Sequence, residues 1–439
     1  MTTPKTSLLT TTPRIIKRHK AERRFRAYGA FAVLLALAAL VFLVTSIINN
    51  GAGAFRQTYI TMPVELPEAK LDKSGTRDLA VMKKVSTFGY SPLVTKALMA
   101  QIEKLGIETP LKKKQIGALV SKAAAAQLRD FVLANPDVVG STLEFEFLAS
   151  GRIDGYLKGR VSHQSAELDG KISPEQLELV DDLKAHGLIK KRFNWAFITG
   201  PDASGQRPES AGLGVAILGS LYMMLVVLLL ALPIGVSASI YLEEFAPQNR
   251  WTDLIEVNIS NLAAVPSIVF GILGLAIFIN FAGLPQSAPI VGGFVLTLMT
   301  LPTIIISTRA SLKSVPPSIR EAALGVGASK MQTVFHHVLP LAAPGILTGT
   351  IIGLAQALGE TAPLLLIGMV AFVGEFPAAP PEGLFDPATA LPVQVYNWTQ
   401  RADPGFVERA SGAVIVLLLF LVTMNVAAVM LRRRFERRW

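Results

Sequence analysis

The sequence contains no cysteine, so neither a disulfide framework nor a metal site with thiolate ligands can form. Charge is also scarce: Asp, Glu, Lys and Arg make up 17% of the 439 residues, whereas a soluble protein of this length carries about a quarter. The charge that is present is concentrated at the two ends and in one central stretch. This distribution predicts a membrane protein with one polar insert.

Groups that commonly carry catalysis are missing too. No Gly-x-x-x-x-Gly-Lys-Ser/Thr phosphate loop occurs, and the one Gly-Lys pair is followed by isoleucine. His163 and His186 have no histidine or cysteine nearby. The adjacent His336 and His337 point to different faces of a helix, so a shared metal is not expected. The chain is therefore predicted to hold no metal and to hydrolyse no ATP itself.

Long apolar runs dominate what is present. Each is about 20 residues or longer, the length that a helix needs to cross a bilayer core of about 30 Å. An even number of spans places both ends of the chain on the same side of the membrane. The six predicted spans are residues 27–48, 213–242, 259–281, 289–308, 345–373 and 413–431.

Basic residues flank these runs and indicate the orientation. Lys and Arg are concentrated in residues 1–26 and 432–439, which the positive-inside rule places in the cytoplasm as basic tails. This placement, rather than nucleic-acid binding, accounts for the net charge of +10. The loop 243–253 fits less well, because Arg250 is its one basic residue. A cleaved signal ending near Gly51 is the alternative for the first run, whose length favours a permanent span.

Residues 49–210 are polar and predict a compact α+β domain on the outer side of the membrane. Apolar residues at helical spacing predict two amphipathic helices, and Ser173 has the features of a capping residue at the start of a third. Partial alternation of apolar and polar residues predicts strands. The two helices are 91–105 and 111–134, and the strands are 143–148 and 155–161.

A cytoplasmic loop, residues 309–340, lies between the fourth and fifth predicted spans. Pro316 and Pro317 end one segment and start a helix, which Ser318 is able to cap. Strong helix formers follow, beginning with Glu321, an acid expected in the first turn where the helix dipole favours it. The first part of the loop is therefore predicted to be a short helix.

Glycines interrupt that helix and a second one follows. Gly325 and Gly327 allow a sharp turn or a close backbone approach. The second helix is predicted from Ser329 to about His337, and Pro340 is expected to stop it. The sequence thus predicts two short helices joined by a glycine elbow at the membrane surface.

This pattern resembles the EAA loop of ABC-importer permeases, in which the loop supplies the coupling helix that docks into a groove on the ATPase subunit. His337 departs from the pattern, since relatives usually carry Ile or Val there. An ordinary interfacial helix pair is the alternative. The positions that match the motif, and that the resemblance assigns to ATPase coupling, are Glu321, Ala322, Ala323, Gly327, Leu339 and Pro340.

The fifth predicted span contains a carboxylate, Glu360, in an otherwise apolar helix. Insertion of such a group costs about 2.5 to 3.5 kcal/mol, so it is expected to face a pathway or a neighbouring subunit. Gly359 and Pro363 flank it and weaken the helix, as is tolerated where backbone lines a cavity. Gln356 lies one turn earlier on the same face. Packing of Glu360 against a neighbouring helix remains the alternative.

Residues 359–366 look like the signature of phosphate permeases of the PstA type. The stretches 231–244, 261–269 and 301–316 are similar to the same family. The resemblance covers nearly everything after Gly212 and the first span, but not most of the outer domain. It implies an all-α polytopic membrane protein with six transmembrane helices, in which a type I ABC-importer permease core over residues 211–431 carries an inserted extracytoplasmic α+β domain.

Cargo residues follow from the resemblance with one departure. Many relatives have arginine where this chain has Gln356, so a bound phosphate would lose an evident positive partner. Arg309, at the cytoplasmic end of the fourth span, is a candidate to attract the anion, although it could equally be a positive-inside anchor. The predicted pathway residues are Glu360, Gln356, Thr361 and Arg309.

The implied partners are two ATPase subunits that bind the ATP, a second related permease and a periplasmic phosphate-binding protein, in the lipid of the bacterial inner membrane. No cofactor is expected in this chain. Within the same class, sulfate or molybdate could be the cargo. A membrane sensor would need a sizeable cytoplasmic output domain, and a membrane enzyme would need clustered acids or nucleophiles. The cytoplasmic segments are short and the spans offer one clear glutamate, so both are disfavoured.

Overall fold

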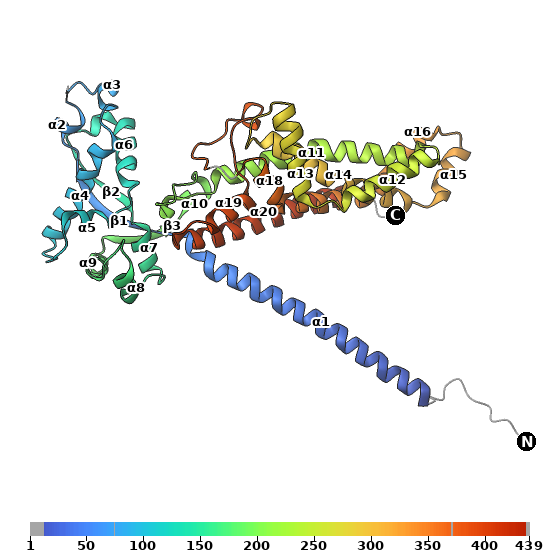
Figure 1. Ribbon diagram of the computed structural model, residues 1–439, viewed down its shortest axis with the longest axis horizontal. Helices are drawn as coiled ribbons and strands as arrows, with labels where there is room; N and C mark the ends of the chain where they lie inside the picture. The colour runs from blue at the N-terminus through green and yellow to red at the C-terminus, as the bar shows by residue number, and fades with distance from the viewer. Residues whose placement is uncertain (1–12, 74, 370–371, 436–439) are drawn as a thin grey trace, which may run out of the picture. The chain divides into compact units, whose positions relative to one another are not determined.

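The computed structural model describes residues 13–73, 75–369 and 372–435. These residues are mostly helical, with one three-stranded sheet (Figure 1). They form two compact units, one ending at Asn50 and the other beginning at Gly51, and each is described by itself. The outermost parts of the two predicted basic tails, and two residues of the predicted span 345–373, lie outside the described residues.

The first unit is formed by α1 (Pro13–Gly51), a helix of 39 residues. Its first residue suits the start of a helix, because the N–H that proline lacks would have no partner there. The predicted span 27–48 lies within α1 and is confirmed as helix. The basic segment before it is helical as well, with Arg26 paired to Glu22 one turn earlier at 2.7 Å.

The second unit begins with a polar domain on an antiparallel sheet of three strands: β1 (Arg56–Glu65) at the centre, β2 (Thr142–Leu148) on one side and β3 (Ile189–Phe193) on the other. Alternate residues of β1 are buried on one face, among them Ile60 and Met62, which lie opposite Phe147 and Phe145 of β2. This alternation confirms the strand predicted at 143–148.

Helices pack around this sheet. They are α2 (Glu68–Leu71), α3 (Leu79–Met82), α4 (Thr87–Lys104), α5 (Lys113–Gly117), α6 (Ala124–Ala134), α7 (Gly151–Leu157), α8 (His163–Leu168), α9 (Pro174–Ala185) and α10 (Trp195–Thr199), with 3-10 turns η1 (Ala52–Phe55), η2 (Pro136–Val138) and η3 (Pro208–Ser210). The predicted helix 91–105 is confirmed by α4. The predicted start at Ser173 is confirmed by α9, where the Ser173 N–H donates to Gln176 at 2.9 Å.

The predicted single helix 111–134 is wrong, because the chain leaves the helical conformation between α5 and α6. There Val120 forms an isolated bridge with Ala149, and the Ser121 N–H donates to the carbonyl of Leu148 at 2.8 Å. The sheet edge thus offers these backbone groups partners outside a helix, and helical periodicity alone does not register that competition.

The strand predicted at 155–161 is also wrong, because α7 occupies its first half. Asp154 is buried, and its carboxylate accepts the N–H of Thr58 in β1 at 3.1 Å. Lys158, one helical turn later, pairs with the same carboxylate at 2.6 Å. The helix places both groups on one face, so contacts with the rest of the domain override the local alternation.

The membrane core follows η3. Its elements are α11 (Gly214–Ile240) with the π-helical turn η4 (Tyr241–Phe245), α12 (Arg250–Ala263), α13 (Ser267–Gly274) with the π-helical η5 (Leu275–Phe281), α14 (Pro289–Lys313), α15 (Pro317–Gly325), α16 (Lys330–Gln332), the π-helical η6 (Thr333–Val338), α17 (Leu339–Gly359), α18 (Ala362–Leu366), the 3-10 turn η7 (Glu382–Leu384), α19 (Leu391–Thr399) and α20 (Gly405–Phe435). The described residues contain five helices that are long and apolar enough to cross a membrane, and α1 is one of them.

A sixth span is present if the pair of α12 and α13 counts as one. The two parts meet at an angle of 101°, so the predicted span 259–281 is not a single straight helix. Pro266 lies at the bend and is the residue just before α13. Proline disfavours the helical conformation in the residue before it and suits the start of the next helix, which accounts for the break.

Small residues bring the spans close together. The spans α11 and α14 lie side by side (Figure 1). Helices α14 and α17 are also in contact along their length. Gly345 and Gly349 of α17 face Ser311 and Ser307 of α14 so closely that a Cβ on either glycine would overlap the serine side chain. Close approach through glycine and serine is typical of packing between helices in a membrane.

Candidate functional site

The glycine elbow between α15 and α16 is a helix-terminating motif. Gly327 has φ +89, and its N–H donates to the carbonyl of Leu324 at 3.0 Å. The N–H of Ala328 donates to the carbonyl of Ala323 at 3.1 Å. These two bonds are the pair of a Schellman motif, in which a left-handed residue just past the helix satisfies its last carbonyls. The turn predicted from two glycines is therefore made by Gly327, whereas Gly325 is still helical.

The second arm of the elbow begins with a capping box. The N–H of Gln332 donates to the hydroxyl of Ser329 at 3.2 Å, and the Gln332 side chain accepts the Ser329 N–H at 2.8 Å. The expected stop at Pro340 is wrong: α16, η6 and α17 form one continuous helix. The π-helical η6 (Thr333–Val338) ends two residues before Pro340. Its wider turns accommodate the proline ring, which would clash with the preceding turn of an α-helix, and the missing N–H of proline.

Two details of the first arm also differ from expectation. Glu321 lies in the second turn of α15 rather than the first, since the helix begins at Pro317. No side chain caps this helix, so Ser318 does not have the predicted capping role. Glu321 and Ala322 are exposed, whereas Ala323 is buried beneath them.

Apolar side chains are exposed at the tip of the elbow. Val326 is 87% exposed, and Leu324 and Met331 are about half exposed. They gather within a few residues of Gly327, on a segment that the two helix arms hold in shape. Apolar groups presented together at a polar surface are typical of a docking site for another protein.

Arg320 anchors the elbow to the spans. Its guanidinium donates to Glu244 in η4 at 2.7 Å and to the carbonyls of Leu312 and Val315 at 2.9 and 2.8 Å. One side chain thus ties α15 to the ends of α11 and α14. The sequence pattern predicted no partner for Glu244.

Arg309 is bound by carboxylates. It donates to Glu243 at 3.2 Å and to Glu256 at 2.5 Å, and Lys313 lies 3.6 Å from Glu243. Glu243, an acid of the predicted loop 243–253, is thus paired with two cations of α14. These contacts favour the alternative role of Arg309 as an anchor over a free cation that attracts an anion.

The predicted span 345–373 is wrong as one continuous helix, because the apolar helix that could cross a membrane begins at Lys330 and ends at Gly359, just before the predicted carboxylate. Helix α17 ends at Gly359, Glu360 has extended backbone (φ −78, ψ 129), and α18 starts at Ala362 with Pro363 in its first turn. Among the described residues, the Glu360 carboxylate has no hydrogen-bond or ion-pair partner, although it is only partly exposed. The alternative in which Glu360 bonds to a neighbouring helix of this chain is therefore disfavoured.

A second break lies close to this one. Gly271 of α13, just past the bend at Pro266, lies against Pro363 of α18 so closely that a side chain would not fit. Gln356 is exposed and Thr361 is partly exposed beside the break. Discontinuous helices that meet in this way are a common design of sites within membrane transporters.

A buried polar junction joins the polar domain around the sheet to α20, and sequence reasoning missed it. Arg409 of α20 is only 2% exposed. Its guanidinium donates to the carbonyls of Ala54 and Glu209 at 3.1 and 3.0 Å and to the side chain of Gln57 at 2.6 Å. The sequence signal that could have revealed it is the adjacent charged pair Glu408 and Arg409, just before the predicted span 413–431.

The other charge of that pair, Glu408, is buried too. It accepts hydrogen bonds from Lys158 at 2.9 Å and pairs with Arg160 at 2.5 Å, both from the polar domain. Lys158 in turn contacts Asp154. The junction is thus a network in which the buried charges compensate one another across the domain boundary.

Glu209 makes the junction sensitive to pH. Burial raises the pKa of its carboxyl above the usual 4.5, although the Ser121 hydroxyl donates to it. Above pH 4.5 the unfolded chain releases this proton before the folded one does, so the carboxyl contributes less stability as pH rises. We expect the stability of Glu209→Gln relative to the unaltered protein to rise as pH increases above 4.5, measured as thermal midpoints by circular dichroism.

The exposed Glu167→Gln is the matched control for this measurement. Its thermal midpoint should follow that of the unaltered protein at every pH. A difference between Glu209→Gln and the unaltered protein that stays constant or shrinks with rising pH would contradict the assignment.

Comparisons with known proteins agree with this geometry. Residues 231–439 match the family described as "binding-protein-dependent transport system inner membrane component", and residues 12–167 match a domain of unknown function. The chain is 33% identical over 246 residues to the probable ABC transporter permease protein YqgI of Bacillus subtilis, covering 54% of this chain and 82% of that protein.

Two further relatives have names that include a cargo. The phosphate transport system permease protein PstA 1 of Mycobacterium tuberculosis is 33% identical over 236 residues, covering 53% of this chain and 75% of that protein. PstA of Pasteurella multocida is 30% identical over 220 residues, covering 50% and 76%. The chain therefore belongs to the family of inner-membrane components of binding-protein-dependent transport systems, as a multi-pass ABC transporter permease component that is not itself catalytic.

Proposed function

We propose that this chain is a permease subunit of an ATP-driven importer of inorganic phosphate, and that its elbow couples the ATPase to the spans. The phosphate assignment is supported by the names of the relatives and by residues 359–366. The observation that carries the coupling role is the Schellman elbow at Gly327, with the exposed apolar tip formed by Leu324, Val326 and Met331.

The path of the coupling movement follows from the continuous helix. Residues from Lys330 to Gly359 form one rod of 30 residues, about 45 Å long at 1.5 Å per residue. When ATP binding closes the two ATPase subunits, a displacement of the elbow moves the near end of this rod. Its far end is the break at Glu360, so the same rigid-body movement opens or closes the backbone there.

Glu321, Ala322, Ala323 and Gly327 are proposed to form the docked arm of the elbow, and Leu339 and Pro340 the start of the rod. Glu360, Gln356 and Thr361 are proposed to line the pathway. A phosphate anion would be repelled by an ionised Glu360, so the partner of this carboxylate is proposed to be a donor or cation of the second permease. That subunit would also replace the positive charge that Gln356 does not provide.

Replacement of Glu360 by glutamine keeps its shape and removes its charge. We expect Glu360→Gln to lower phosphate uptake at least about tenfold, which corresponds to loss of one charge-assisted contact. Measurement is by uptake of labelled phosphate and by co-purification of the second permease. Glu375→Gln, on an exposed acid outside the break, is the control and should transport normally. Normal uptake and normal co-purification by Glu360→Gln would rule out the proposed role.

The orientation is proposed to place both basic tails in the cytoplasm and the domain of residues 49–210 on the outer side of the inner membrane. The absence of native cysteine allows a clean test. In intact cells, a membrane-impermeant thiol reagent is expected to label Lys104→Cys in the outer domain and to leave Lys330→Cys at the elbow unlabelled until the membrane is opened. The reverse labelling pattern would contradict the proposed topology.

The cargo is tested by uptake of labelled phosphate, sulfate and molybdate in cells with and without this protein, in a background lacking other phosphate importers. Loss of phosphate uptake alone is expected. Loss of sulfate or molybdate uptake instead would leave the permease assignment intact and identify that oxyanion as the cargo.

A further inference from the structure

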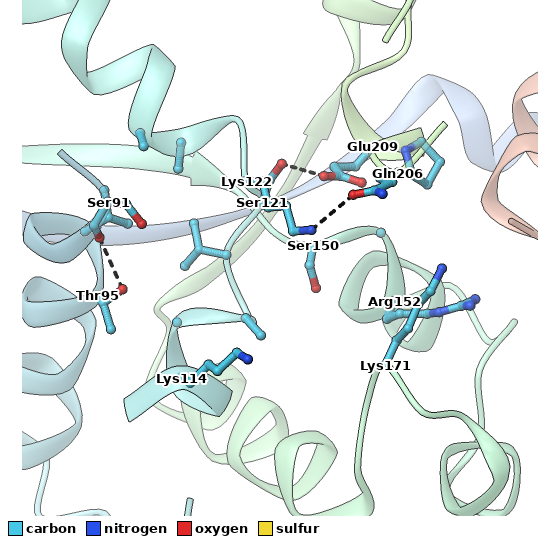
Figure 2. A pocket seen from close by; sticks show the side chains of 18 of the residues that line it. Ser91, Thr95, Lys114, Ser121, Lys122, Ser150, Arg152, Lys171, Gln206 and Glu209 are labelled. Carbon is cyan, nitrogen blue, oxygen red and sulfur yellow. Dashed lines mark hydrogen bonds between the residues drawn. The ribbon is translucent and has the colours of Figure 1, made fainter. Parts of the chain in front are cut away.

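The outer domain contains a cavity of about 610 Å³. Its wall is formed by α4, α5, the start of α7 and the segment that leads from the domain to α11 (Figure 2). Sites for small organic molecules in proteins range from about 300 to 1,000 Å³. The cavity therefore has the size of a metabolite site and is much larger than a single inorganic anion requires.

Two cations in this cavity lack a counter-ion. Among the described residues, Lys114 has no hydrogen-bond or ion-pair partner, and Lys122 contacts only the amide oxygen of Gln206, at 3.4 Å. They come from different segments, and in Figure 2 both side chains reach into the same space as the hydroxyl of Ser150. Two ammonium groups without a carboxylate partner that line one cavity favour an anionic occupant.

The opposite wall is electrically balanced. Arg152 pairs with Asp169 at 2.9 Å, and Lys171 lies 3.4 Å from Asp403. These two cations are therefore matched by two carboxylates. Lys114 and Lys122 are left without a carboxylate partner, and the Glu209 carboxylate, which also lines the cavity, has no ion-pair partner among the described residues. One positive charge therefore remains as a surplus when Glu209 is ionised, and two remain when it is protonated.

The rest of the lining is apolar or hydroxylic. Val94 of α4, together with Val120 and Ala125, presents hydrocarbon to the cavity, and Ser150 presents a hydroxyl for which no partner occurs among the described residues. At the floor, Ser121 and Glu209 are buried and hydrogen-bonded to each other. Such a surface accommodates an organic body as well as a charged head.

We propose that this cavity binds an anionic organic molecule of metabolite size, with its charged head on the side of the cavity that carries Lys114 and Lys122 and its apolar body against Val94 and Val120. This function goes beyond transport. Glu209 lies just before α11, and Asp403 lies just before α20. A bound molecule thus contacts the connections from the outer domain to two spans, which makes the domain a place where a metabolite can act on the permease.

The test uses the full-length protein in lipid nanodiscs and phenyl phosphate, a water-soluble dianion with an apolar ring. Saturation-transfer NMR is expected to detect the ring protons bound to the protein. The double variant Lys114→Glu/Lys122→Glu is expected to weaken the dissociation constant at least about tenfold, because charge-assisted contacts are lost. Both lysines are exposed, so the fold should persist, which circular dichroism checks.

The matched control is Lys84→Glu/Lys104→Glu, with the same charge change at exposed positions away from the cavity. It should bind phenyl phosphate like the unaltered protein. Phenol and inorganic phosphate should each compete at least about tenfold less well than phenyl phosphate, because each lacks one half of the recognised chemistry. The proposal is overturned if phenyl phosphate does not bind, if both double variants behave alike, or if inorganic phosphate competes equally, which would mean a simple anion site.

Discussion

We expect Gly327→Val to abolish uptake while the protein still inserts into the membrane. The reason is conformational rather than steric: a Cβ at this position would meet no atom within 4 Å, but the residue has φ +89. An ordinary side chain pays about 1–2 kcal/mol there and a β-branched one more. The elbow would open, and the apolar tip would no longer be held in the orientation needed to dock.

Gly325→Ala is the matched control. This glycine is two residues away, equally open to solvent, and within the helix α15. Alanine there is expected to stabilise the helix by about 0.5–1 kcal/mol and to leave uptake intact. Labelled phosphate uptake and the amount of protein in the membrane fraction are measured together. Normal uptake by Gly327→Val would remove the elbow from the coupling path.

The second large effect is expected at the buried junction. Glu408→Gln removes one of two buried carboxylates, Asp154 and Glu408, that pair with Lys158 and Arg160. Removal of one partner from a buried ionic network costs about 3–5 kcal/mol. For a domain of this size, we expect the thermal midpoint of the polar domain to fall by roughly 6–20 °C. Protease cleavage between the domain and α11 should increase at temperatures that the unaltered protein resists.

Glu382→Gln, on an exposed acid, is the control and should leave the midpoint unchanged. A double variant, Glu408→Gln with Arg160→Gln, restores the charge balance. It should recover part of the lost stability, which identifies the charge network rather than a local packing defect as the cause. Equal midpoints for Glu408→Gln and the control would show that the junction does not stabilise the domain.

Local chemistry made the elbow predictable. Only glycine adopts φ near +89 without strain, and a serine followed three residues later by glutamine is a helix start on its own. Both signals are confined to a few residues around Gly327 and Ser329, so the sequence predicted a turn here, although only the structure assigned it to Gly327 and not to Gly325. The end of the second arm was not predictable in the same way, because η6 accommodates Pro340 through a backbone adjustment rather than a change of residue type.

The ion-pair partners of Arg309 and Arg320 could not be predicted from the neighbouring residues in the sequence. The contacts of Arg309 with Glu256 and of Arg320 with Glu244 join residues 53 and 76 positions apart. Arg309 therefore suggested an anion site from its location alone, whereas its neighbours in space neutralise it. The same limit applies to Asp154, whose bond to β1 turned a predicted strand into α7.

By itself, the sequence determined that the chain crosses the membrane repeatedly, carries a polar domain between its first two spans and weakens the helix on both sides of Glu360. Each of these follows from hydrophobicity over about 20 residues or from the intrinsic preferences of glycine and proline. Only the tertiary structure decided where α12 and α13 bend, which acids neutralise Arg309 and Arg320, how Glu408 and Arg409 join the domain to α20, and which lysines face one cavity. Those features depend on residues far apart in the chain that become neighbours only when the helices pack.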